Sequence, residues 1–165
     1  MYSKMIYDRT QFDVSQAQII RKSLQAKLNA LDQGFDVVLS SSDIEKLERG
    51  TCTVNMINRI NNKQREVADL LNSVGFNIQI TTENYTTENI FKKTQHDLLI
   101  NNNKTLRNAI SVFDTTPQNP TYIYRYNNAN SIEKILVDLE DLINKMKHAF
   151  IHCGTRSSGQ GGLIR

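Results

Sequence analysis

Apolar residues recur at alternating steps of four and three through residues 130–153, which is the spacing of one face of an α-helix. The members of this stripe are Ile132, Leu136, Leu139, Ile143, Met146, Phe150 and Cys153. Asn130 and Glu133 match a capping box, and Gly154 is a residue type that ends helices. Ile135, Leu142 and Ala149 widen the stripe. We therefore predict a long C-terminal helix that packs in a bundle or in a three-stranded coiled coil.

Two helices are predicted in the first third of the chain from the same period. The first covers residues 11–31. The second is short, starts at a capping box formed by Ser42 and Glu45, and ends at Gly50. Between them, the apolar run at residues 35–39 is either extended or tucked under the first helix.

Two further helices are predicted in the middle of the chain. One covers residues 53–74, and its apolar face is interrupted by the amide of Gln64, with Asn61 close by. The other covers residues 88–113. The asparagine run at residues 100–104 predicts a kink or a frayed turn there, because asparagine side chains compete for backbone hydrogen bonds.

Two segments alternate with the period of a β-strand instead. Phe76, Ile78 and Ile80 alternate with polar residues, which predicts a short half-buried strand. The tyrosines at 122, 124 and 126 alternate with Ile123 and Arg125. This second segment is either a strand that pairs with the first or an extended arm over the helices.

The expected fold class is mainly α. We expect a helical bundle of three long helices plus one short helix, with at most a small two-stranded β element and a C-terminal helix able to form a coiled coil. At 165 residues the chain is the length of one domain. Residues 1–153 are expected to form this single helical domain, and residues 154–165 a Gly/Ser-rich tail.

Composition narrows the classes of function. The net charge is only +3, which does not favour nucleic-acid binding. No stretch approaches eighteen apolar residues, so we expect no membrane span, and the N-terminus lacks the apolar core of a signal peptide. Two cysteines are too few for a disulfide framework.

The residues that carry chemistry do not form a recognisable active site. His148 and His152 are spaced to share a helix face beside Cys153, but this is an incomplete set of zinc ligands. The acids of the C-terminal helix are interleaved with lysines, as on a solvated face. We therefore predict no catalytic, metal-binding or cofactor-binding residues and expect a protein that is not an enzyme. A metal-dependent hydrolase stays open as a further alternative.

A DNA-binding alternative depends on the helix within residues 51–75. Its polar side chains could reach bases or phosphates, although Glu66 and Asp69 interrupt the positive face. The residues concerned are Asn55, Asn58, Arg59, Asn62, Lys63 and Arg65. A small DNA-binding or regulatory protein is therefore the alternative function.

Five sequence blocks point to a family. They are YDRTQFDV (7–14), LERGTCTVNMINRINNKQREVADLL (47–71), TPQNP (116–120), YNNANSIEKILVDLEDLI (126–143) and CGT (153–155). In this order they resemble a small structural domain of tail and baseplate proteins from phages and prophages of Gram-positive bacteria. The resemblance implies a non-enzymatic virion protein of the tail or baseplate, at the tail tip or fibre attachment, that is made in the host cytoplasm. It implies other tail or baseplate proteins as partners and no cofactor.

In that role two sets of residues are candidates for interactions. Tyr122, Tyr124 and Tyr126 are expected to contact another virion protein, because tyrosine is enriched at protein interfaces. Asn61 and Gln64 are expected to fix the register of packed helices, within the chain or between copies. Virion proteins are commonly symmetric, so we expect a homo-oligomer, and the broad C-terminal stripe allows a trimer.

Overall fold

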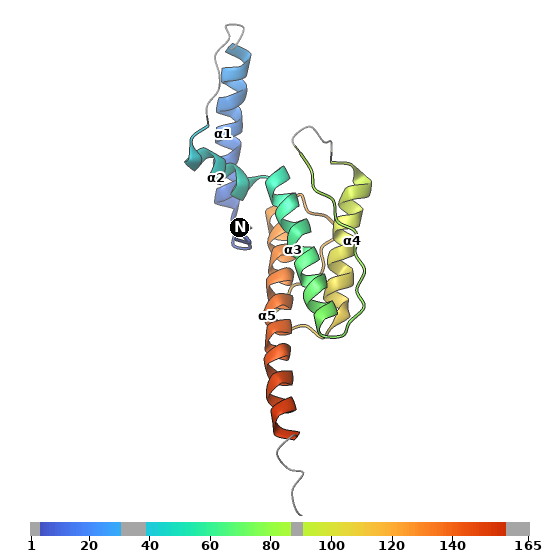
Figure 1. Ribbon diagram of the computed structural model, residues 1–165. Helices are drawn as coiled ribbons and strands as arrows, with labels where there is room; N and C mark the ends of the chain where they lie inside the picture. The colour runs from blue at the N-terminus through green and yellow to red at the C-terminus, as the bar shows by residue number, and fades with distance from the viewer. Residues whose placement is uncertain (1–3, 31–38, 87–90, 158–165) are drawn as a thin grey trace, which may run out of the picture.

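A computed structural model describes residues 4–30, 39–86 and 91–157, most of which are helical (Figure 1). The five helices are α1 (Gln11–Ala30), α2 (Ser41–Gly50), α3 (Val54–Ser73), α4 (Lys93–Ala109) and α5 (Tyr126–Ser157). The mainly α class is therefore confirmed. The expected count of three long helices and one short helix is wrong, because four of the five have 17 residues or more. The described ranges contain no β-strand.

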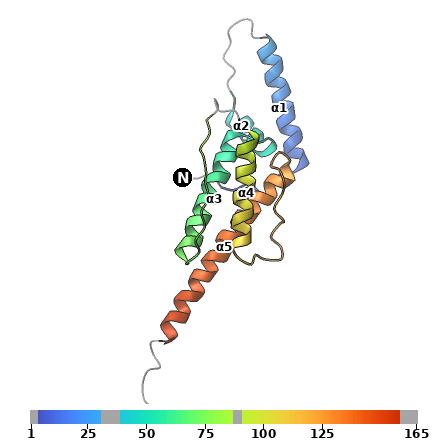
Figure 2. The ribbon, with the colours of Figure 1, turned by 90° about the vertical axis from the view of Figure 1, so that its right-hand side faces the viewer.

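Helices α3, α4 and α5 form a bundle in which all three run in the same direction (Figures 1 and 2). The contacts between α3 and α5 confirm this direction, because later residues of α3 contact later residues of α5. On α3, Arg59 is bonded to Glu133 of α5, and Lys63, one turn later, is bonded to Glu140. Because consecutive parallel helices start at the same end of a bundle, the chain has to travel back twice, once before α4 and once before α5.

The first return, residues 74–86, runs antiparallel to α3. Asparagine side chains of α3 bond its backbone at distances of 2.7–3.0 Å, where a neighbouring strand would otherwise supply the partners. The bonded pairs are Asn58 with Tyr85, Asn61 with Glu83, and Asn72 with Ile78. Phe76, Ile78 and Ile80 pack on the core, half-buried. The alternating pattern therefore marks an extended segment, and the predicted strand is wrong.

The second return, residues 110–125, runs antiparallel to α4. Asn103 Nδ2 of α4 donates to Asn119 Oδ1 at 2.6 Å, and Arg107 Nε donates to the carbonyl of Pro117 at 2.8 Å. The hydroxyl of Thr116 donates to Asp138 of α5 at 2.9 Å. Residues 110–121 therefore lie along α4 without forming a strand. The strand or extended arm expected at residues 122–126 is not found as predicted, because residues 123–125 bend and Tyr126 is the first residue of α5.

The asparagine run of α4 is helical throughout, so the frayed turn predicted there is wrong. Asn102 and Asn103 are buried at 6% and 0% exposure. Asn102 donates to the carbonyl of Thr81 at 2.7 Å on the first return, and Asn103 bonds the second return. The side chains therefore bond the two returns and leave the helix backbone intact. The predicted limits of 88–113 shorten to those of α4.

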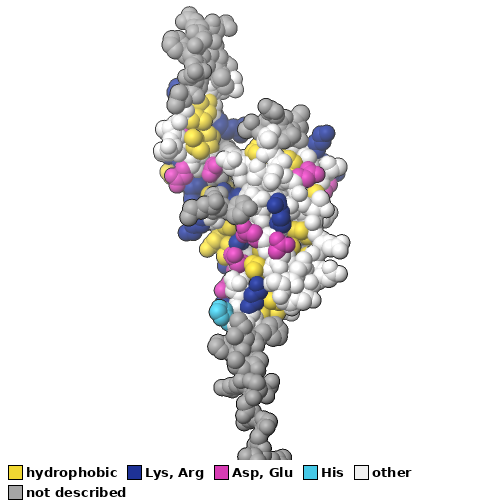
Figure 3. Space-filling view, in the orientation of Figure 1, with side chains coloured by type: hydrophobic (Ala, Val, Ile, Leu, Met, Phe, Trp, Pro, Cys, Tyr) yellow, Lys and Arg dark blue, Asp and Glu magenta, His cyan; other side chains and the backbone are white. Residues whose placement is uncertain are grey.

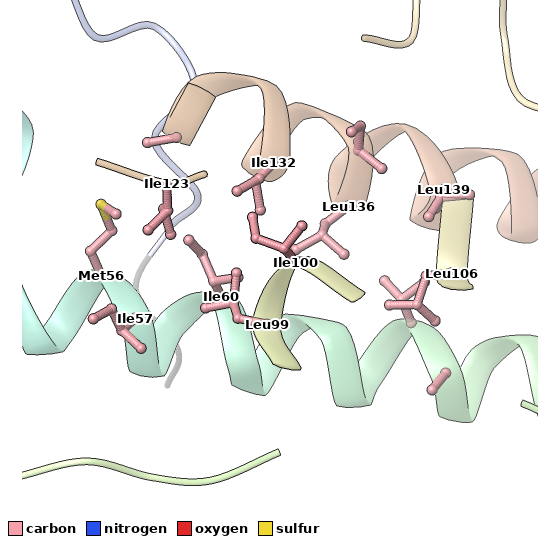
Figure 4. Close-up of a cluster of buried hydrophobic side chains, with 14 of the residues drawn as sticks. Met56, Ile57, Ile60, Leu99, Ile100, Leu106, Ile123, Ile132, Leu136 and Leu139 are labelled. Atoms are coloured by element: carbon pink, nitrogen blue, oxygen red, sulfur yellow. The ribbon is translucent and has the colours of Figure 1, made fainter. Parts of the chain in front are cut away.

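The core lies between α3, α4 and α5, as the close-up of the cluster shows (Figure 4). The predicted stripe of α5 is buried there over its first half, and α5 then continues beyond the ends of α3 and α4 (Figures 1 and 2). The stripe residues with no exposed surface are Ile132, Ile135, Leu136, Leu139 and Ile143. The predicted limits of this helix are wrong at both ends: it begins at Tyr126 and continues through Gly154 to Ser157. The coiled coil stays a prediction.

Helices α1 and α2 pack mainly on each other and form a helical hairpin beside one end of the bundle (Figure 1). They cross closely at Gly50, where an added Cβ would lie 2.2 Å from the carbonyl oxygen of Asp13 and 2.4 Å from Ala17 Cβ. The cap of α2 is Ser40, which accepts from the backbone N–H of Asp43 at 3.1 Å, and not Ser42 as predicted. The apolar run at residues 35–38 lies outside the described residues.

Candidate functional site

The amino-terminal segment, residues 4–10, is bonded to the start of α5 through Glu133. This carboxylate has no exposed surface. Its Oε1 accepts from Nη2 of Arg9 at 2.7 Å and from Nη2 of Arg59 at 2.9 Å, and its Oε2 accepts from the backbone N–H of Ile6. The two arginine side chains are 2% and 3% exposed. We call this group the Arg9–Glu133–Arg59 cluster. It replaces the capping role predicted for Glu133.

Asn130 strengthens the same connection. It lies inside α5, so the prediction that it caps the helix is wrong. Its Oδ1 accepts from the backbone N–H of Arg9 at 3.1 Å, and its Nδ2 donates to the backbone carbonyl of Arg9 at 2.9 Å. Three of the blocks that carry the family resemblance, containing Arg9, Arg59 and Asn130 to Glu133, therefore meet at one buried point.

A cleft of about 460 Å³ lies next to this cluster, between the hairpin and the bundle. We call it the junction cleft. Its walls come from the start of α1, the end of α2 and the beginning of α5. The lining residues are Arg9, Gln11, Val14, Arg49, Gly50, Thr51, Cys52, Met56, Ile123, Tyr124, Arg125, Tyr126, Asn127 and Ala129. Of the residues predicted to form an interaction surface, the structure brings Tyr124 and Tyr126 together here.

The third tyrosine, Tyr122, lies beside the junction cleft, where the guanidinium of Arg125 sits 5.8 Å from its ring centre. Tyr124 is 60% exposed and stacks on His96 with 5.2 Å between ring centres and 10° between planes. Tyr126 is half-buried. The aromatic surface that was predicted is therefore centred on Tyr124.

The junction cleft is lined by three arginines, and none of its described lining residues is acidic. Arg49 is already paired, at 3.0 Å to Asp13 and 3.2 Å to Asp8. Burial alone would raise the pKa of the Asp13 carboxyl, but hydrogen bonds from Arg49 and Thr10 hold that pKa below its usual value, so this pair stays charged at neutral pH. The space-filling view shows basic and acidic side chains side by side at the end of α1 nearest the bundle (Figure 3).

Cys52 also lines the cleft, and its side chain is exposed. Desolvation by the surrounding protein raises the pKa of its thiol to about 11, although the charge of Arg9 acts in the opposite direction. Because the thiolate is the nucleophile, this pKa makes Cys52 a weaker nucleophile at neutral pH than an ordinary cysteine.

Only part of the group considered for zinc has described side chains. His148 is exposed on α5, while the side chains of His152 and Cys153 lie outside the described ones. His96 is buried under Tyr124, with Nδ1 3.0 Å from Asp97 Oδ1. Across the described ranges, no three His, Cys, Asp or Glu residues are arranged to hold a metal ion. The helices described there are also not long and apolar enough to cross a membrane.

Asn61 and Gln64 are buried at 3% and 0% exposure, and their amides bond other parts of the same chain. Gln64 Nε2 donates to the carbonyl of Leu99 on α4 at 2.9 Å, and Asn61 bonds the first return. These contacts fit the part of the hypothesis in which the amides set the register within one chain.

Sequence reasoning missed Arg9 and gave Glu133 the wrong role. One signal was present. Glu133 lies between Ile132 and Ile135, inside the width of an apolar stripe, where an acid needs a cationic partner. Nothing in the local pattern indicated that the partners are 74 and 124 positions away.

Comparison with models of known protein families, with curated proteins and with solved structures finds no match for this chain.

Proposed function

We propose that this chain is a non-enzymatic structural protein of a phage virion, in the tail or baseplate and at the tail tip or fibre attachment, acting by protein–protein packing. One observation carries the proposal. Three of the five sequence blocks that resemble the tail and baseplate domain meet at the Arg9–Glu133–Arg59 cluster, which ties the N-terminal segment, α3 and α5 together. This meeting of distant blocks supports the resemblance as a likeness of one folded domain, and the structural role is what that resemblance implies.

Exposed apolar side chains on α1 and at the junction cleft support protein contacts. On α1, Phe12 is 69% exposed and Ile19, on the same helix face, is 60% exposed. Tyr124, which is 60% exposed, lines the cleft. Exposed apolar patches of this kind are typical of interaction sites. Within this proposal the chain forms a homo-oligomer, with a trimer as the state that the broad stripe of α5 allows.

Location in the virion tests the proposal. The chain would be tagged in a phage that encodes it, and purified virions would be stained with a gold-labelled antibody against the tag. We expect gold at one end of the tail. Virions without label, from lysates that contain the tagged protein, would contradict the proposal.

The tyrosine surface has its own test. Replacing Tyr122, Tyr124 and Tyr126 with serine is expected to abolish incorporation into virions while the helical circular dichroism spectrum is kept. The single change Tyr124→Ser disturbs the fold least, because this ring is the most exposed of the three. Undiminished incorporation of the triple variant would remove this surface from the proposal.

The alternative, a small phage DNA-binding or regulatory protein, predicts a different result. Arg59 is buried in the cluster and Asn58 is bonded to the first return, so neither is free to contact DNA. We expect no salt-dependent affinity for duplex DNA in a titration. A steep loss of affinity with rising salt would favour the alternative.

A further inference from the structure

We propose that the junction cleft binds a peptide segment of a partner protein that presents one carboxylate beside an apolar side chain. This inference rests on the proposed function for the place of that partner in the virion, and it adds the chemistry by which the partner is recognised.

Arg125 supplies the charge that the cleft leaves unmatched. It is exposed, it lines the cleft, and no carboxylate of the described chain pairs with it. Arg49 has two acidic partners, and Arg9 shares Glu133 with Arg59. A carboxylate from outside the chain would therefore find one arginine available.

The beginning of α5 adds donors on the same wall. Tyr126 and Asn127 form the first turn of α5 and line the cleft, and this turn carries no acidic residue. Backbone N–H groups of a first turn lack acceptors within the helix, and the helix dipole makes this end favourable for an anion. A helix start beside an arginine that has no carboxylate partner is a suitable environment for a carboxylate.

Arg9 adds positive charge to the wall. It lines the cleft, and its guanidinium shares the single carboxylate of Glu133 with Arg59, so the Arg9–Glu133–Arg59 cluster keeps one net positive charge. A positive charge that is not neutralised within a cleft favours an anionic ligand there.

The remaining wall is apolar. Val14, Met56, Ile123 and Ala129 line the cleft, and Gly50 contributes no side chain to fill it. The volume of about 460 Å³ lies in the range of sites that enclose a few side chains. An aliphatic side chain next to the carboxylate would bury its surface there.

The surroundings favour a peptide over a nucleic acid. Single-stranded nucleic acids follow a continuous positive groove. Here Asp8 and Asp13 flank Arg49, and the Asp8 side chain is 72% exposed. A polyphosphate backbone would meet these acids as it left the cleft, whereas a single carboxylate beside Arg125 would not.

The test uses the full chain and two small probes in a titration monitored by amide NMR shifts. Acetyl-Asp-Leu-amide at millimolar concentration is expected to shift the amides of Gly50, Thr51 and Asn127 in a saturable manner. Acetyl-Asn-Leu-amide, which has the same shape and no charge, is the control ligand and is expected to bind about fivefold more weakly, the size of one exposed ion pair.

Two variants complete the design. Arg125→Gln is expected to weaken binding of the charged probe about fivefold, and Lys104→Gln, which removes an exposed cation of α4 outside the cleft, is expected to leave it unchanged. Equal binding of the two probes, unchanged binding by Arg125→Gln, or absence of shifts at these amides would overturn the inference. Larger NMR shifts of the same amides on addition of a short oligothymidylate would overturn it in favour of nucleic acid.

This outcome is separable from that of the proposed function. A chain that labels virions but does not bind the charged probe would overturn only the inference about the cleft. A chain that binds the probe and is absent from virions would contradict the proposed function and leave the carboxylate site in place.

Discussion

At the scale of single residues, Glu133 pairs with two arginine side chains, which is more cationic partners than any other buried acid of the described residues has. It lies between two guanidinium groups that are almost fully buried, and each of these retains an Nε without an acceptor in the described chain. Because a buried ion pair costs desolvation energy, its net contribution to stability is small, but removing one member leaves the other charges uncompensated. This carboxylate is therefore a point of high sensitivity.

Glu133→Gln is expected to destabilise the protein by about 3–5 kcal/mol, because two buried cations lose their only carboxylate. Urea unfolding monitored by circular dichroism measures this. Asp141→Asn is the control, since Asp141 forms an exposed pair with Lys145 at 2.6 Å, and its loss should cost at most about 0.5 kcal/mol. Similar midpoints for the two variants would show that Glu133 is not held as described.

The thiol of Cys52 gives a prediction about pH. Its pKa of about 11, against an ordinary value of 9.0, keeps it protonated at pH 8. Iodoacetamide is expected to alkylate it about tenfold more slowly than an unstructured cysteine peptide, because fewer thiolates outweigh their higher nucleophilicity. The rate should rise until the pH passes about 11. Mass spectrometry of the Cys153→Ser variant follows this site alone, and peptide-like rates would contradict the prediction.

At the scale of elements, the helices were predictable and the segments between them were not. The spacing of apolar residues shows which side of a segment is buried. In α3 and α5 this spacing has the period of a helix, so the local sequence is enough to predict the element. The same signal at Phe76, Ile78 and Ile80 also reports a buried side, but it does not identify what bonds the backbone. Here the partners are asparagine side chains of α3, so no strand forms.

Gln64 tests whether such amides hold elements together. In Gln64→Leu, the carbonyl of Leu99 loses its amide donor and Asn102 loses an acceptor at 3.5 Å, which is expected to cost about 1–3 kcal/mol. Because both contacts lie within one chain, light scattering should show an unchanged oligomeric state. Asn101→Leu, at an exposed position of α4, is the control. Unchanged stability in thermal unfolding would remove the register role of Gln64.

At the scale of the whole molecule, the hairpin of α1 and α2 is joined to the bundle through few connections. Its internal packing depends on the crossing at Gly50, and Arg49 ties α2 to Asp8 and Asp13. The junction cleft exists because these two parts meet without merging into one core. No part of this arrangement could be read from the periodicity, which indicates buried faces but not the direction of neighbouring helices or the height at which they cross.

Gly50→Ala is expected to disrupt the hairpin, because its Cβ would overlap the backbone of Asp13, at a cost of about 1–3 kcal/mol. Amide hydrogen exchange should accelerate in α1 and α2 and change little in α3, α4 and α5. Ser42→Ala, at an exposed position of α2, serves as the control. Faster exchange spread evenly over all five helices would mean that hairpin and bundle unfold as one unit.

The parallel direction of α3, α4 and α5 also has a kinetic consequence. Antiparallel bundles fold quickly because helices joined by a short loop touch as soon as the loop closes. In this molecule each new helix reaches its neighbour only after an extended segment has retraced the length of the previous one. The chain should therefore cross a higher entropic barrier than other helical proteins of its size, and its refolding rate in stopped-flow experiments should resemble that of mixed α/β domains.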